Sequence, residues 1–473
     1  MRNPEENRGV KTLRAEPGSY RDPGGTVYET SEHIYRSITE LSFNEFQTVL
    51  ASGFLQRLIA EGLLVDLERV GEAALGIVSE NARAVLRHPR LSFISYPYEW
   101  CFEALKRAAL LHLDIQLRAL DCDIALVDAS AYNVQFVGCR PIFIDHLSFR
   151  PYKQGEYWFG YTQFLEQYLN PLLLRALLGV PHNDWYRGRL EGIPTADLNR
   201  LMPLYRKLSF KVLCHVTLPV RLQTAATTGH LRATGLVRRT SLPRSSYRGL
   251  LVQLRGWIAG LSPQPTPDTR WQRYEQISTY ALQELNAKRQ FVATFVERTK
   301  PRQLWDLGCN TGAFSELALE SGAGEVIGFD FDHGALDLAF ARSCEKHLRF
   351  LPLFLDAANP SPAQGWAGTE RKDLPSRGRA DALLALAFLH HLVIGRNVPL
   401  AKAVAWLTSL APRGVLEFVP KGDPTVRTML QLRKDIFLNY TKDGFLNVLS
   451  QGARIVKQEI ITSTGRVLVW YER

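Results

Sequence analysis

The sequence predicts an α/β protein in which a mainly helical α+β half precedes a doubly wound parallel sheet. Three observations predict this class. From residue 303 onward, short apolar runs alternate with segments of helical periodicity, as in strands joined by crossover helices. Two apolar runs at the end of the chain flank the turn "TSTG" and predict an antiparallel hairpin. Three prolines within residues 261–269 mark a boundary between the halves.

The chain divides into four predicted segments. Residues 1–25 are charged and rich in Gly and Pro, which predicts a flexible arm. An α+β domain follows over 26–260, then a Pro-rich linker over 261–271, then the α/β domain over 272–473. In the first domain, residues 98–126 have helical spacing, and "NVQFVG" and "RPIFIDHLSF" predict two strands joined by a glycine turn.

The elements of the second domain follow in order. Five apolar runs predict the parallel strands, which cover residues 303–307, 325–330, 350–355, 381–387 and 414–419. Helical periodicity predicts the connecting helices, over 272–298, 312–321, 333–342, 397–410 and 424–450. A Pro/Gly-rich insertion separates the third and fourth strands, and "ARIVKQEII" with "RVLVWYE" forms the closing hairpin.

Composition bounds the class of protein. The 473 residues, 46% hydrophobic and 22% charged, have the balance of a globular protein with two or three domains. No run of 18 apolar residues predicts a membrane span, and the amino terminus lacks the apolar core of a signal peptide. None of the six cysteines forms a C-x-x-C pair, which favours a reducing cytoplasm over a disulfide framework or zinc ribbon.

The net charge of +10 is concentrated in one segment. Residues 181–256 contain 13 Lys and Arg against three acidic residues. Such a segment could attract nucleic acid or an anionic surface. Because aromatic residues are sparse there, we expect a solvated helical connector with snorkelling arginines, and nucleic acid is an unlikely partner.

The stretch "LWDLGCNTGAFS" predicts a ligand site where the first parallel strand meets its helix. Asp306 ends the strand, Gly308 permits a sharp turn, and Gly312 opens a helix whose first N–H groups are free. Asp330 ends the second strand 22 residues after Gly308, where an acid commonly binds a ribose diol. In a doubly wound sheet, ligands bind at these carboxyl ends.

Two ligand classes fit an acid at this place, a dinucleotide and S-adenosylmethionine. The dinucleotide fingerprint G-x-G-x-x-G maps poorly, since Asn310 and Ala313 replace glycines. Asp306 would also oppose a pyrophosphate, whereas it attracts the ammonium and sulfonium groups of S-adenosylmethionine. The charge argument therefore predicts S-adenosylmethionine.

The same stretch resembles the first motif of class I S-adenosylmethionine-dependent methyltransferases, D/E-x-G-x-G-x-G, with Asn310 at the middle glycine. The resemblance covers roughly residues 285–473, because "EVIGFDFD", "LFLDAAN", "DALLALAFLHHL" and "GVLEFVPKGDP" follow in order. It implies a Rossmann-like, seven-stranded methyltransferase sheet closed by an antiparallel hairpin.

The resemblance also implies roles for individual residues. The implied donor contacts are Asp306, Gly308, Asn310 and Gly312 around the methionine part, Asp330 at the ribose, Asp356 and Ala357 at the adenine, and Leu386 and Ala387 along the donor. Taken singly, Asp330 or Asp356 could instead cap a helix.

A closer resemblance concerns the acceptor side. "LHHL" and "EFVPKGDPTV" look like bacterial methyltransferases related to a nodulation-factor fucose O-methyltransferase. This implies O-methylation of a carbohydrate or small hydroxylated metabolite, with His390 or His391 as the general base. The two histidines could also cap a helix or fill a turn. Glu417 and Lys421 could contact the acceptor, although Glu417 could equally pair with a cation. No ligand pattern predicts a metal.

A second constellation lies in the first half. Asp128 precedes Asn133 by five residues, and Asp145 ends a strand twelve residues later. This spacing resembles the catalytic loop and metal-binding Asp of protein-kinase-like and aminoglycoside- or choline-kinase-like folds. The resemblance implies that Asp128 is a base and that Asn133 and Asp145 bind Mg²⁺.

The first half departs from the kinase pattern in three ways. Leu126 and Val127 stand where His and Arg are usual, no lysine lies between Lys11 and Lys106, and no Gly-rich loop is evident. A kinase-like scaffold without phosphotransfer, or plain turn and cap residues around a hairpin, therefore remain alternatives.

The sequence as a whole predicts a cytoplasmic S-adenosylmethionine-dependent methyltransferase acting on a small-molecule or carbohydrate acceptor. Two alternatives stay open. One is a non-catalytic binding or regulatory scaffold with a degenerate kinase-like module, and the other is a bifunctional kinase–methyltransferase.

Overall fold

The computed structural model describes residues 14–70, 81–220, 241–264, 281–431 and 433–473. Its carboxyl-terminal half is built on a seven-stranded sheet in the order β12-β11-β10-β13-β14-β16-β15. The first five strands are parallel and the last two form an antiparallel hairpin, as predicted. The strands are β10 (Gln303–Leu307), β11 (Glu325–Asp330), β12 (Phe350–Phe354), β13 (Ala382–Ala385), β14 (Arg413–Phe418), β15 (Arg454–Ile460) and β16 (Val467–Glu472).

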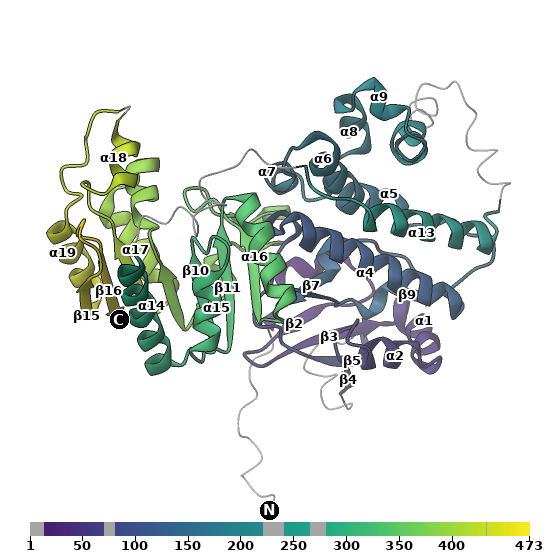
Figure 1. Cartoon of the computed structure of the whole chain (residues 1–473). Helices are drawn as coiled ribbons and strands as arrows, with labels where there is room; N and C mark the ends of the chain where they lie inside the picture. Colours follow the sequence, from purple (N-terminus) through teal and green to yellow (C-terminus); the bar gives the residue numbers. More distant parts are fainter. Residues whose placement is uncertain (1–13, 71–80, 221–240, 265–280, 432) are drawn as a thin grey trace, which may run out of the picture.

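Helices connect and flank these strands (Figure 1). Every residue of β13 is buried, as expected for a parallel strand covered on both faces. The helices are α14 (Leu282–Thr299), α15 (Ala313–Glu320), α16 (His333–Glu345), α17 (Leu400–Leu410), α18 (Pro424–Leu430) and α19 (Lys442–Gly452). The predicted helix over 272–298 and the predicted linker over 261–271 extend into residues outside the described ranges.

The amino-terminal half begins with a five-stranded antiparallel sheet in the order β1-β2-β3-β5-β4. Two helices, α1 (Glu40–Ala51) and α2 (Phe54–Ala60), follow its third strand. The strands are β1 (Arg14–Ala15), β2 (Val27–Glu29), β3 (His33–Thr39), β4 (Glu68–Arg69) and β5 (Ala82–Pro89). Of the predicted flexible arm, 1–13 lie outside the described residues, whereas 14–25 contain β1 and a 3₁₀ turn and belong to this sheet.

The long helix predicted over 98–126 is α4 (Phe102–Asp121), and α13 (Arg244–Ala259) packs along it. The predicted hairpin is β7 (Val134–Val137) with β8 (Arg140–Phe143), turning at Gly138. Short strands β6 (Ile124–Leu126) and β9 (Phe149–Pro151) pair beside it. The remaining helices are α5 (Tyr161–Phe164), α6 (Asn170–Leu178), α7 (Asn183–Gly188), α8 (Thr195–Leu201), α9 (Leu204–Lys207) and α10 (Phe210–Val212), with π-helical turns over Leu165–Leu169 and Leu213–Thr217.

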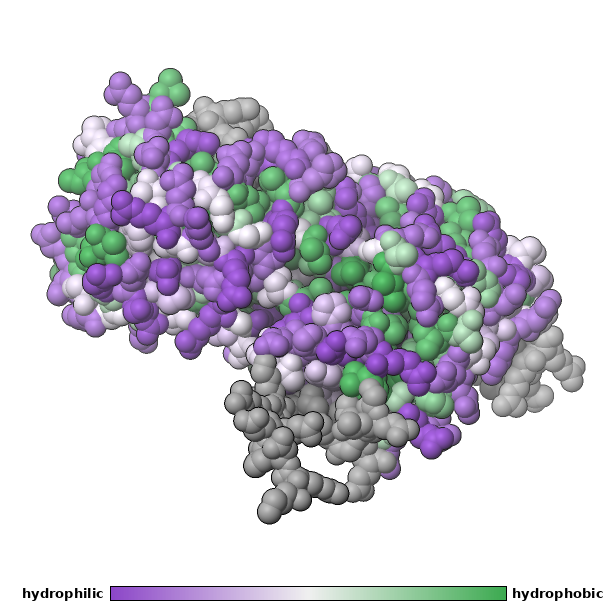
Figure 2. Space-filling model, turned by 90° about the horizontal axis from the view of Figure 1, so that it is seen from below, coloured by the Kyte–Doolittle hydropathy of each residue, from purple (hydrophilic) through white to green (hydrophobic). Residues whose placement is uncertain are grey.

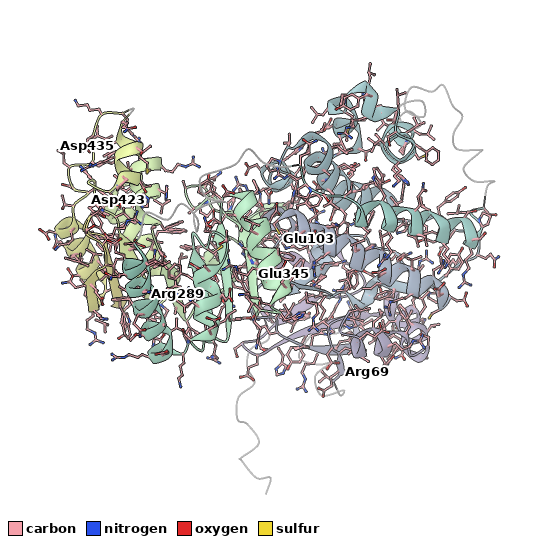
Figure 3. All side chains as sticks on the ribbon, in the orientation of Figure 1. Arg69, Glu103, Arg289, Glu345, Asp423 and Asp435 are labelled. Carbon is pink, nitrogen blue, oxygen red and sulfur yellow. The ribbon has the colours of Figure 1, made fainter. Side chains whose placement is uncertain are left out.

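The two halves share one continuous hydrophobic core. Helix α16 contacts α4, and Figure 3 places Glu103 of α4 and Glu345 of α16 at this junction. The insertion between β12 and β13 also reaches the first half, where Arg377 forms a buried ion pair with Glu99 at 2.5 Å. The Pro/Gly-rich insertion therefore joins the halves.

The outer surface is mostly polar. Figure 2 shows one face, where hydrophilic side chains predominate and hydrophobic ones gather in patches. None of the helices within the described residues is both long enough and apolar enough to cross a membrane.

Candidate functional site

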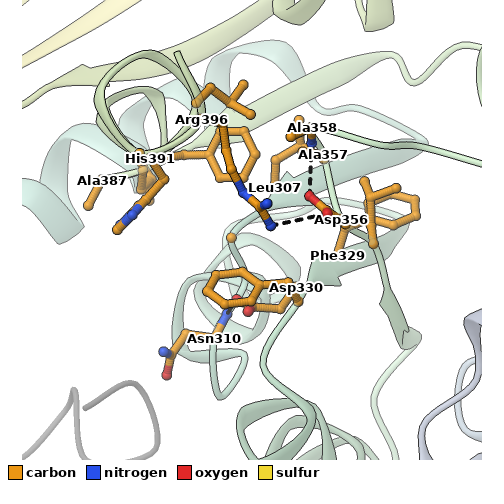
Figure 4. Close-up of a pocket in the computed structure, with 17 residues that line it drawn as sticks. Leu307, Asn310, Phe329, Asp330, Asp356, Ala357, Ala358, Ala387, His391 and Arg396 are labelled. Carbon is orange, nitrogen blue, oxygen red and sulfur yellow. Dashed lines mark hydrogen bonds and ion pairs between the residues drawn. The ribbon is translucent and has the colours of Figure 1, made fainter. Parts of the chain in front are cut away.

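A cavity of about 210 Å³ lies at the carboxyl ends of β10, β11, β12 and β13 (Figure 4). Its walls are the loops that follow these four strands, together with the π-helical turn His391–Gly395. This is the place where doubly wound sheets bind ligands. The cavity therefore forms where the sequence predicted a site.

The loop after β10 supplies the first wall. Gly308 has φ +77°, a conformation that favours glycine, and a Cβ there would lie 3.0 Å from the Phe388 ring. Asn310 also has positive φ, and its backbone N–H donates to Asp330 Oδ2 at 2.8 Å. Gly308 and Asn310 line the cavity, and their contact with a donor stays a prediction.

Gly312 lies close to the Phe350 ring. It is not among the residues that line the cavity. It has φ +84°, and a Cβ there would lie 2.5 Å from the Phe350 ring. The close approach of the Phe350 ring thus requires a glycine at this position, and the contact of Gly312 with a donor stays a prediction.

Asp330 presents a fixed carboxylate to the cavity. Its Oδ2 accepts from Asn310 N, and its Oδ1 accepts from the N–H of Asp332 at 2.9 Å. Burial raises the pKa of Asp330 to about 6, because these two hydrogen bonds only partly offset the cost of desolvating the charge. Two backbone N–H groups therefore fix the Asp330 carboxylate on the cavity wall.

Asp306 lies behind the cavity wall rather than on it. It is 1% exposed, and its Oδ2 accepts a hydrogen bond from Ser315 Oγ at 2.7 Å. The predicted direct contact of this carboxylate with a ligand is therefore not met. Burial, with the nearby Asp330 as a smaller cause, raises the pKa of Asp306 to about 6. When ionised, the two acids together make this end of the cavity negative.

The loops after β12 and β13 form the opposite wall. Asp356, Ala357, Leu386 and Ala387 all line the cavity, and their contacts with a donor stay predictions. Asp356 accepts from the N–H of Ala358 at 3.0 Å and pairs with Arg396 at 3.1 Å (Figure 4). Sequence reasoning missed Arg396, because its position on the wall depends on the path of the chain after the π-helical turn.

The structure separates the two candidate histidines. His391 lines the cavity, and burial lowers its pKa to about 4. His390 is 2% exposed and does not line the cavity, although its ring centroid lies 4.1 Å from that of His391. Burial, with His391 as a second cause, lowers the pKa of His390 well below its usual value. Only His391 of this pair is placed to act on a ligand, as a neutral imidazole.

Glu417 and Lys421 are not placed at the cavity. Glu417 is fully buried, pairs with Lys288 at 2.7 Å, and accepts from the N–H of Ala387 at 2.9 Å. The alternative that Glu417 pairs with a cation is therefore confirmed, and its role is to hold the loop after β13. Lys421 pairs with Asp435 at 2.7 Å. Full burial leaves Glu417 no surface for an acceptor, whereas the contact of Lys421 with an acceptor stays a prediction.

One relative among known proteins shows which family this chain belongs to. The chain is 48% identical over 456 residues to nodulation protein NoeA of Rhizobium meliloti strain 1021, covering 96% of this chain and 95% of that protein. This chain belongs to the NoeA family. No protein-family model matches it.

Solved structures resemble part of this NoeA-family chain. One is magnesium protoporphyrin IX methyltransferase of Synechocystis PCC 6803 with bound SAH, at 20% identity and TM-score 0.30, covering 42% of this chain and 93% of that one. Another is the N-methyltransferase NodS of Bradyrhizobium japonicum WM9, at 14% identity and TM-score 0.29, covering 40% and 97%. At these TM-scores the likenesses carry no argument about function. The function is therefore argued from the geometry of the site.

In this NoeA-family chain, the three residues of the kinase-like pattern lie close together. They are Asp128, Asn133 and Asp145. Asn133 Nδ2 donates to Asp128 Oδ2 at 3.0 Å and lies 3.5 Å from Asp145 Oδ2. Arg36 on β3 pairs with Asp145 at 3.5 Å and also with Asp22. Burial raises the pKa of Asp128, and the nearby Asp145 raises it further. Among the described residues, no group of three or more His, Cys, Asp or Glu could hold a metal.

Proposed function

We propose that the carboxyl-terminal half is an S-adenosylmethionine-dependent methyltransferase domain. The observation that carries this proposal is Asp330, a fixed carboxylate on a cavity wall beside the turn of Gly308 and Asn310. An acid that ends the second strand is suited to accept hydrogen bonds from both hydroxyls of a ribose. A nucleoside-containing ligand therefore fits this wall.

The charges around the cavity favour a cationic donor over a dinucleotide. Asp330 and Asp356 lie on the wall, and Asp306 lies behind it. Arg396 also lines the cavity, but its guanidinium is paired with Asp356. A pyrophosphate would be repelled by this arrangement, whereas an ammonium and a sulfonium would be attracted.

The acceptor we propose is a hydroxyl group of a carbohydrate or small hydroxylated metabolite. When bound, S-adenosylmethionine supplies an electrophilic methyl group, whose bond to sulfur breaks as its bond to the acceptor oxygen forms. His391 is neutral above its pKa of about 4, so its imidazole can accept the proton that the hydroxyl releases. Methyl transfer also requires the acceptor oxygen to lie in line with the methyl group and the sulfur, an alignment that a binding site can supply. The proposed compartment is the cytoplasm, which fits six cysteines that are all free thiols.

Isothermal calorimetry with S-adenosylmethionine tests the donor. We expect Asp330→Asn to weaken binding by about 10- to 100-fold, because hydrogen bonds to a charged group contribute roughly 1.5–3 kcal/mol. Asp443→Asn is the matched control, since Asp443 is exposed on α19 and away from the cavity. Failure of the wild-type protein to bind, or equal binding by both variants, would reject the proposal.

Metabolite comparison tests the acceptor. Cells that lack the gene, compared by mass spectrometry with wild-type cells, should accumulate a hydroxylated compound that is one methylene group lighter than its wild-type counterpart. If the compound instead lacks a methyl group on a nitrogen atom and gains no free hydroxyl, the O-methylation proposal is wrong. The proposal for the donor would still stand.

For the first half we propose a kinase-like scaffold without phosphotransfer. The supporting observation is Arg36, whose guanidinium bridges Asp145 and Asp22 beside the place where a metal would bind. A cation fixed there competes with Mg²⁺ for Asp145. Titration with Mg·ATP should show no binding. Binding that Asp145→Ala abolishes would instead support the bifunctional alternative.

A further inference from the structure

Residues 201–218 expose an unusual number of apolar side chains. Elsewhere in the described residues, large exposed apolar side chains are mostly scattered, which needs no explanation. Of the 23 large apolar side chains that are exposed in the described residues, seven lie within these 18 residues. They are Leu201, Leu204, Tyr205, Leu208, Phe210, Leu213 and Leu218.

The segment is ordered because its other face is anchored to the body. Val212 and Val216 are buried in the core, and His215 Nδ1 lies 2.8 Å from the Tyr161 hydroxyl. The exposed side chains therefore belong to a held surface rather than to a frayed end. Helices α8 and α9, which carry part of it, lie at the top of Figure 1, beyond α6 and α13.

Basic side chains alternate with the apolar ones. Arg206, Lys207 and Lys211 occur among them, and none of the ion pairs found between described residues includes these three. The sequence contains no acidic residue between Asp197 and Asp268. Exposed leucine and aromatic side chains interspersed with unneutralised cations are typical of a surface that enters the interface of an anionic bilayer.

We propose that residues 201–218 dock this protein on an anionic lipid surface. The apolar side chains would enter the acyl boundary while Arg206, Lys207 and Lys211 contact the headgroups. Other occupants fit less well. A second copy would bring the same positive charge, and residues 221–240 of this chain add four arginines and no acid. Nucleic acid would use the cations but gives exposed leucines no partner.

Co-sedimentation of the full chain with vesicles tests the proposal. Wild-type protein should bind vesicles of phosphatidylcholine with phosphatidylglycerol, and bind pure phosphatidylcholine vesicles much more weakly. The triple variant Arg206→Gln/Lys207→Gln/Lys211→Gln should bind anionic vesicles roughly 100-fold more weakly, since each cation near the surface contributes about fivefold. The triple variant Leu204→Ser/Leu208→Ser/Phe210→Ser should lose at least about tenfold.

Controls keep the outcomes distinct. Leu438→Ser removes a leucine that is 81% exposed in the other half and should change nothing. If a triple variant fails to fold, Leu208→Ser alone replaces it, because Leu208 is 83% exposed. No vesicle binding, or equal binding to both vesicle types, would overturn the proposal. So would single-stranded RNA binding that only the cation variant loses, or self-association that only the leucine variant loses.

Discussion

Asp306 on β10 and Asp330 on β11 are buried carboxylates whose charge lowers the stability of the fold but favours the proposed donor. Asp306 is enclosed and has its pKa raised to about 6, so at neutral pH the folded protein holds a charge that burial disfavours. Carboxylates with raised pKa values cluster at functional sites, so the burial of Asp306 fits the donor site that we propose.

Replacing Asp306 with Asn should therefore stabilise the ligand-free protein. The folded-state pKa lies above the usual value of 3.8, so the wild-type protein loses stability as pH rises through about 6. At about pH 8 the variant should gain on the order of 2–3 kcal/mol in the free energy of unfolding, and nothing at about pH 3. Urea denaturation at both pH values measures this. Equal stability at high pH would contradict it.

The same pKa values set a pH dependence for donor binding. Asp330 loses its charge as pH falls through about 6, so affinity for S-adenosylmethionine should weaken by up to about tenfold per pH unit below that value. His391 stays neutral down to about pH 4 and should not contribute. Calorimetry across this range measures the profile. The variant His391→Gln should show the same pH profile, and a profile whose midpoint moves in this variant would contradict the assignment to Asp330.

At the scale of single residues, sequence reasoning placed the site but not the orientation of its members. Asp330 was predicted because an acid that ends a parallel strand lies at the ligand-binding edge of the sheet, whereas Asp356 was implied only by the resemblance to methyltransferases. The same argument could not show which of the adjacent residues His390 and His391 faces the cavity. Which of the two faces the cavity depends on the turn at Ala387, where φ is +49° at a non-glycine residue, and on Glu417, which holds that turn.

At the scale of elements, glycine positions show which part of the first motif is structural. Gly312 and Gly322 both have positive φ, at +84° and +105°. A Cβ at Gly312 would meet the Phe350 ring at 2.5 Å, whereas a Cβ at Gly322 would meet nothing within 4 Å. A side chain at Gly312 would therefore cause both backbone strain and steric overlap, whereas one at Gly322 would cause backbone strain alone.

We expect Gly312→Ala to lower the free energy of unfolding by about 2–5 kcal/mol, from strain of about 1–2 kcal/mol plus overpacking of about 1–3 kcal/mol. Gly322→Ala should lower it by strain alone, about 1–2 kcal/mol. Chemical denaturation of both variants measures the difference. Equal losses would show that the Phe350 ring moves aside at little cost.

Strands were more predictable than helix ends. The bounds of β10 and β11 were predicted to the residue, because short apolar runs between turn-forming residues leave little choice. The predicted helix over 98–126 is shorter in the structure, since Pro97 opens a separate 3₁₀ turn and β6 takes the last residues. Helical periodicity alone could not show these ends.

At the scale of the whole molecule, the least predictable feature is how the halves join. The Pro/Gly-rich insertion has the composition of a solvent-exposed loop, yet it supplies Arg377 to a buried pair with Glu99. The guanidinium of Arg377 also lies 4.7 Å from the centroid of the Tyr96 ring. Partners nearly 280 positions apart in sequence leave no local pattern, so only the fold shows them.

Arg377→Met should therefore weaken the junction of the halves. Removing one partner of a buried pair leaves Glu99 desolvated without its cation, which typically costs about 3–5 kcal/mol. Arg454→Met is the matched control, because Arg454 pairs with Glu472 at 2.8 Å but is 75% exposed, so its loss should cost under about 1 kcal/mol. Adding Glu99→Gln to Arg377→Met should recover part of the loss, since no unpaired charge then remains buried. Denaturation followed by tryptophan fluorescence measures all three variants, and a loss for Arg377→Met no larger than that for Arg454→Met would show that the insertion does not hold the halves together.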